Sequence, residues 1–102
     1  MTASSRWMQQ SLISYTNDCL KRIYYHNDEL SNVEFLRIAY DNTVCDVWQN
    51  TVISPFVRNA TEEQLEQTYQ YLRRYKEDKQ FLQLHILNSK QFRQNGKQRN
   101  DK

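Results

Sequence analysis

Glycine and proline are almost absent from this chain, which has one of each in 102 residues. Strand-rich folds need these residues at their turns, so their scarcity argues against a β-sandwich or a β-barrel. The lone Gly96 cannot build a phosphate-binding loop or a dinucleotide-binding fingerprint. We therefore expect an all-α protein that lacks the common nucleotide-binding motifs.

Cysteine and histidine are also scarce, with two of each. In a helical hairpin that turns near residue 28, Cys19 and Cys45 would lie about 10 Å out of register, whereas a disulfide needs Cα atoms closer than ~7 Å. We expect two buried free thiols. Two cysteines and the scattered His26 and His85 do not form a zinc site, and neither histidine has the neighbours of a catalytic triad. The sequence therefore predicts no metal, no cofactor and no enzymatic activity.

Long apolar runs and a strong charge of one sign are missing too. No run approaches the ~20 apolar residues of a membrane span, and the net charge is only +2. The N-terminus lacks the apolar core of a secretory signal, although its single Arg and several Ser faintly resemble a mitochondrial presequence. We expect a cytoplasmic or nuclear protein. The positive charge is concentrated from His85 onward, where five basic residues accompany one acid.

The stretch 30–54 carries the clearest helical signals. Ser31 and Glu34 fit a capping box, with Leu30 and Phe35 placed as a hydrophobic staple. Two apolar stripes follow at helical spacing, which indicates a helix covered on more than one side. Pro55 ends the pattern because it disfavours helical geometry before it and cannot donate a backbone hydrogen bond. We predict one central helix over 31–54.

Helices are expected on both sides of this stretch. The first spans about 5–25 and has one broad apolar stripe, formed by Met8, Leu12, Tyr15, Cys19 and Ile23. The third spans about 61–87, with Thr61 as its N-cap and Gln64 completing a capping box. Its apolar stripe is interrupted at Lys79, where the side chain could extend along the surface, or the helix could kink or end.

The predicted fold is a compact antiparallel three-helix bundle with helices over about 5–25, 31–54 and 61–87. Residues 1–88 would form a single helical domain, and residues 89–102 would form a flexible, disordered basic tail. A fourth short helix beginning at Ser89 is the alternative for this last segment.

Two surfaces suggest functions. Aromatic and apolar residues of the second and third helices exceed what three helices can bury, which favours a protein–protein interaction module such as an adaptor, a regulator or a small subunit of a larger complex. The partner would be another protein or a second copy of the chain. The candidate partner-binding residues are Tyr71, Tyr75, Phe81, Leu84, Leu87 and Phe92.

The alternative function is a nucleic-acid-binding regulator that uses the basic third helix and the tail. Cations would contact phosphates and nearby rings would stack on bases. The candidate residues are Arg73, Arg74, Lys76, Lys79, Lys90, Arg93, Lys97 and Arg99.

Overall fold

The computed structural model describes the backbone of residues 2–100 and the side chains of residues 6–95. In order, its elements are α1 (Thr2–Ile23), α2 (Phe35–Val44), the 3₁₀ turn η1 (Trp48–Asn50), α3 (Phe56–Asn59), α4 (Glu62–Glu77) and α5 (Lys79–Asn100). Over residues 2–100 there is no strand, so the all-α prediction is confirmed. The three-helix detail is not, because five α-helices are present in this part of the chain.

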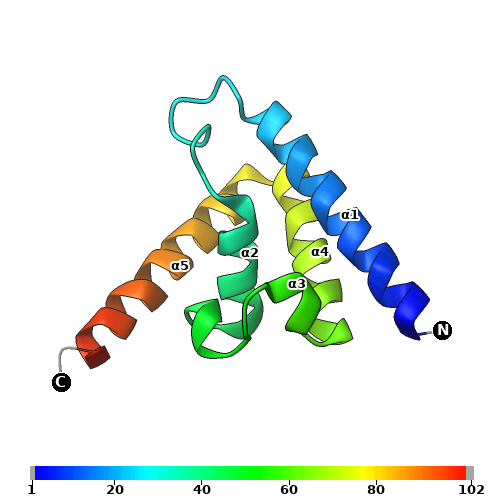
Figure 1. The fold of residues 1–102 in the computed structure, drawn as a ribbon. Coiled ribbons are helices and arrows are strands. Elements are labelled where there is room, and N and C mark those ends of the chain that lie inside the picture. Colours follow the sequence, from blue (N-terminus) through cyan, green and yellow to red (C-terminus); the bar gives the residue numbers. More distant parts are fainter. Residues whose placement is uncertain (1, 101–102) are drawn as a thin grey trace.

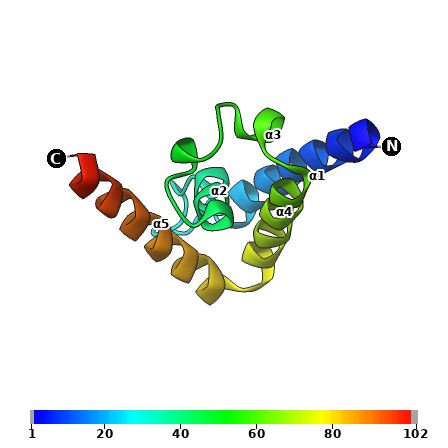
Figure 2. The same ribbon diagram turned by 90° about the horizontal axis from the view of Figure 1, so that it is seen from below.

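In Figure 1 the two long helices, α1 and α5, form the sides of an inverted V, with α2, α3 and α4 between them, and Figure 2 shows the same arrangement from below. Helix α1 packs mainly on α4, and α2 packs on both α4 and α5. The molecule is flat, with principal dimensions of 44 × 33 × 17 Å. A helix with its side chains is about 10–12 Å across. So thin a plate cannot cover every face of its long helices.

The core lies where α1, α2 and α4 meet and continues under the segment from Trp48 to Ala60. There Tyr40 of α2 stacks on Phe56 of α3 with ring centroids 3.9 Å apart, and Trp48 packs edge-on against both. Burial raises the pKa of the Tyr40 hydroxyl to about 12. This aromatic cluster packs the two short elements, η1 and α3, against α2.

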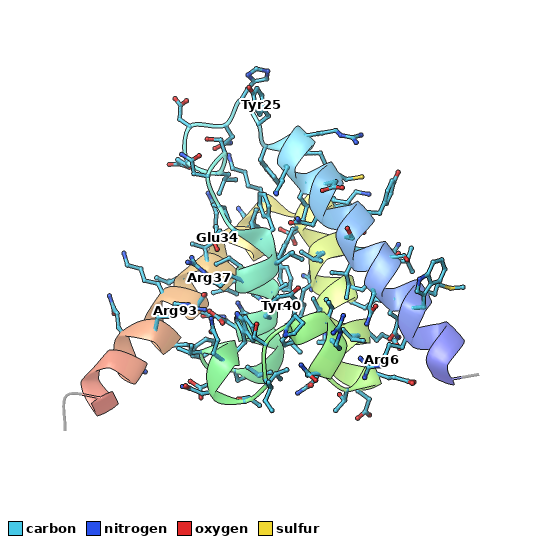
Figure 3. The ribbon with its side chains drawn as sticks, in the orientation of Figure 1. Arg6, Tyr25, Glu34, Arg37, Tyr40 and Arg93 are labelled. Carbon is cyan, nitrogen blue, oxygen red and sulfur yellow. The ribbon has the colours of Figure 1, made fainter. Side chains whose placement is uncertain are left out.

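The N-terminal half of α1 is fastened to the same segment by Arg6, which is labelled in Figure 3. Its guanidinium donates to the carbonyl oxygens of Val57 and Arg58 at 3.1 and 3.2 Å, and also to that of Ala60. These acceptors lie at the C-terminal end of α3, where positive charge is favourable. α1 therefore has a fixed position on the plate from its second turn onward.

The predicted helix over 31–54 is wrong at both ends. At the start, the capping box does not form: the side chain of Asn27 instead accepts hydrogen bonds from the amides of Glu29 and Leu30, both at 2.9 Å. Such an Asn turn competes with helix formation. The chain consequently continues through turns, and α2 begins only at Phe35.

At its other end, α2 stops at Cys45, which adopts the left-handed conformation with φ 59° and ψ 39°. Two aspartates then take backbone donors that a continuing helix would use. Asp46 accepts from the amide of Val47 at 2.7 Å, and Asp41 accepts from the amide of Trp48 at 3.0 Å. The β-branched residues that follow have weak helix propensity, so the segment up to Pro55 forms only the short turn η1.

The predicted third helix is two helices. The capping box at Thr61 and Gln64 is confirmed, with reciprocal bonds of 3.0 and 2.9 Å. The break falls at Asp78, which is extended (φ −134°, ψ 91°) and accepts from the amide of Phe81 at 3.0 Å. The sequence left open whether the helix continues, kinks or ends near Lys79; α4 ends at Glu77 and α5 begins at Lys79.

The segment predicted as a flexible tail is helical as far as the structure describes it, because α5 runs through Ser89 to Asn100. Two of its side chains anchor it: the Ser89 hydroxyl bonds to the Asp41 carboxylate, and Arg93 forms a two-pronged ion pair with the same carboxylate at 2.9 and 3.1 Å. The alternative prediction of a helix from Ser89 agrees better with the structure than the flexible tail does, although α5 begins at Lys79, ten residues before Ser89. Residues 101–102 lie outside the described part of the chain.

Candidate functional site: the uncovered apolar face of α1

Helix α1 has an exposed apolar stripe. Its members are Met8, Leu12, Tyr15, Cys19 and Ile23, which we call the α1 stripe. Met8, Tyr15 and Ile23 are 57%, 65% and 50% exposed, and the other two are half-buried. Trp7, one residue before the stripe, is also exposed. The most regular apolar pattern in the first helix therefore faces away from the core.

Another face of α1 packs against the protein. Ile13, Leu20 and the following Tyr24 are buried there, together with the polar residues Thr16 and Asn17. The hydroxyl of Tyr24 donates to the carbonyl oxygen of Tyr75 at 2.8 Å, which fixes the end of this face against α4. The expectation that both cysteines are buried is wrong: Cys19 is half-buried and Cys45 is exposed, and both are free thiols.

The predicted partner-binding residues do not form one surface. Tyr75 is fully buried in the core, whereas Leu84 and Leu87 lie half-exposed on α5. Tyr71, Phe81 and Phe92 are half-buried. The structure brings only Tyr71, Tyr75 and Phe81 together, around His85.

His85 is buried in this aromatic cluster, with 6% of its surface exposed. Its Nδ1 atom is 2.8 Å from the Tyr75 hydroxyl, and the rings of Tyr71 and Phe81 lie 4.6 and 4.2 Å from its own. Burial, followed by the nearby Arg74 guanidinium, lowers the pKa of His85 to about 4. The imidazole is therefore neutral at physiological pH and joins α4 to α5.

The predicted nucleic-acid residues are dispersed over several faces. Arg74 pairs with Asp78 at 3.5 Å and lies over the Phe81 ring, and Arg73 lies over the ring of Tyr69. Arg93 is engaged with Asp41. The exposed cations Lys76, Lys79 and Lys90 lie on α4 and α5, and the side chains of Lys97 and Arg99 are outside the described set.

These features define an all-α plate with an uncovered apolar helix face. None of the described helices has both the length and the apolar character needed to cross a lipid bilayer. The described side chains hold no cluster of three or more His, Cys, Asp or Glu residues that could bind a metal ion. Comparison of the chain with protein-family models, curated proteins and solved structures finds no match.

Proposed function

We propose that the protein is a small non-enzymatic interaction module, an adaptor, regulator or subunit of a larger complex. It docks its α1 stripe in an apolar groove of another protein. The observation that carries this proposal is the exposure of Met8, Tyr15 and Ile23 on one helical face. Recognition of one helix face by an apolar groove is a common mode of protein association.

The size of the stripe favours a different protein over a second copy. From Met8 to Ile23 the stripe extends roughly 22 Å at about 1.5 Å per residue, and one helix face is about 10 Å wide. It therefore covers on the order of 200–300 Å², well below the roughly 800 Å² per partner of a stable interface. A groove that also reached the exposed Trp7 and Tyr25 would bury more surface than two α1 helices placed face to face.

The test is site-specific crosslinking in cells followed by binding of purified proteins. A photo-reactive benzoylphenylalanine at position 15 is expected to crosslink to one protein, whereas the same group at position 91, on the exposed side of α5, is not. Tyr15→Glu should weaken the purified complex at least tenfold. It should change the free energy of unfolding by no more than about 0.5 kcal/mol, because the side chain is exposed.

A crosslink only to a second copy of the chain would contradict the choice of partner. No crosslink at position 15, or equal crosslinking at positions 15 and 91, would remove the proposal. Ile53→Glu serves as a matched control, since Ile53 is exposed in a loop outside α1.

Nucleic-acid binding is the second candidate function, and one cavity favours it. A pocket of about 370 Å³ brings the rings of Tyr71 and Phe81 together with Arg73 and Arg74, and one acid, Glu77, also lines it. A base could stack there beside cations that hold its phosphates.

If this is the function, a twelve-nucleotide uridine oligomer should bind less tightly as salt rises. Arg73→Glu with Arg74→Glu should abolish that binding, while Lys21→Glu should leave most of it. No binding at low salt would exclude this function.

A further inference from the structure

A cleft with three cations lies between α2 and α5. It has a volume of about 280 Å³, and we call it the α2–α5 cleft. It is lined by Arg37, Ile86, Ser89, Lys90, Arg93 and Gln94. Figure 3 shows Arg37 and Arg93 extending into the space between the two helices. Arg37 belongs to the first turn of α2, so the positive end of that helix lies beside the cleft.

Only one of these cations is already neutralised. Arg93 pairs with the buried carboxylate of Asp41. Arg37 and Lys90 form no ion pair with any described side chain, and Arg37 has a buried Nε atom without a hydrogen-bond partner. A buried donor left unpaired is destabilising, and a bound acceptor would relieve that cost. The described residues that line the cleft include no acid. The chemistry of the cleft therefore favours an anionic group.

Two neighbouring cavities each share a lining residue with the cleft. Arg37 also lines a cavity of about 450 Å³ that extends to Lys21 of α1, and Ile86 also lines one of about 390 Å³ beside Leu30. Val33 lines both of these cavities. Each neighbouring cavity includes one acid, Glu34 in the first and Glu29 in the second, whereas the described lining of the α2–α5 cleft holds cations and no acid. A segment that places an acidic side chain in the α2–α5 cleft, with apolar side chains beside it, complements this arrangement.

We propose that the α2–α5 cleft receives a Glu or Asp carboxylate from an acidic, partly apolar segment of a partner protein. The carboxylate would accept hydrogen bonds from Arg37 and Lys90, while apolar neighbours in the segment contact Ile86. Charge-assisted bonds of this kind are about twice as strong as neutral ones. A nucleic-acid strand fits less well, because no aromatic side chain lines the cleft to stack on a base. The α2–α5 cleft shares no lining residue with the α1 stripe, so failure of one proposal does not imply failure of the other.

The test is an NMR titration of the full ¹⁵N-labelled chain with two designed peptides. One is a twelve-residue repeat of Leu-Glu-Glu-Leu, and the other replaces every Glu by Gln. The Glu peptide is expected to shift the amide signals of Arg37 and Lys90, and to bind more weakly as salt rises. Lys90→Glu should weaken its binding at least tenfold. Lys76→Glu, which changes the net charge equally but lies on α4 outside the cleft, should weaken it less than twofold.

Equal binding of the two peptides, or equal loss in the two charge-reversal variants, would overturn the proposal. So would tighter binding of inorganic phosphate or of a twelve-nucleotide uridine oligomer at the same residues. Since Lys90 is exposed and forms no ion pair with a described side chain, loss of folding is not expected in the informative variant. Its thermal unfolding curve would verify this.

Discussion

Replacing Arg93 by alanine is expected to lower the free energy of unfolding by roughly 3–5 kcal/mol, measured by chemical denaturation. The reason is the environment of its partner. Asp41 has no exposed surface, and among the described residues Arg93 is the cation that pairs with it, through Nε at 2.9 Å and Nη2 at 3.1 Å. Without Arg93, a carboxylate remains buried whose donors among the described residues are the Ser89 hydroxyl and the Trp48 amide.

Two comparisons separate this effect from general loss of helix. Lys90→Ala removes an exposed cation from the same helix and should change stability by no more than about 0.5 kcal/mol. The double variant Asp41→Asn with Arg93→Ala should be more stable than Arg93→Ala alone, since no charge is then left buried. If Arg93→Ala costs less than about 1 kcal/mol, the ion pair does not hold α5 on α2.

The ion pair between Arg93 and Asp41 also shows why the sequence did not predict that the segment from Ser89 onward is helical. Residues 89–95 are polar and have few apolar positions, which is typical of a flexible tail. What holds them is a carboxylate 48 residues before Ser89 and 52 before Arg93. No local pattern links these positions. The same carboxylate also accepts from the Trp48 amide just after α2, so Asp41 contributes to both errors.

Local signals were reliable where no nearby side chain competed for the same stretch of backbone. The capping box at Thr61 and Gln64 formed as predicted, because both partners lie within one turn. The similar motif at Ser31 and Glu34 did not form, since Asn27 had already drawn the preceding backbone into a turn. A capping motif therefore indicated a helix start only where no side chain just before it formed a competing turn.

The α1 stripe illustrates a different limit. Periodicity correctly identified five apolar residues on one face of a helix, but it could not tell which face meets the core. The buried face mixes the apolar Ile13, Leu20 and Tyr24 with the polar Thr16 and Asn17, so its pattern is less regular than the stripe although it is the face that packs on α4. The α2–α5 cleft could not be predicted from the sequence either, because Arg37 and Lys90 are 53 residues apart in the chain.

Lowering the pH from 7 to 5 is expected to reduce the free energy of unfolding by about 2 kcal/mol through His85 alone. The folded protein holds the pKa of His85 at about 4, chiefly by burial, whereas an unfolded histidine titrates near 6.5. Between these values the unfolded state binds more protons. The stabilisation is therefore complete above about pH 6.5 and is lost progressively as the pH falls towards 4, where the total reaches about 3 kcal/mol.

Urea denaturation at half-unit pH steps would measure this dependence. His85→Gln keeps a hydrogen-bonding group near the Tyr75 hydroxyl but cannot titrate, so its stability should be nearly flat between pH 7 and 5. His26→Gln should keep the wild-type slope, because His26 is exposed in the turn after α1. A wild-type curve that is flat in this range, or a His85→Gln curve as steep as that of the wild type, would show that the imidazole does not have to be neutral for α4 and α5 to pack together.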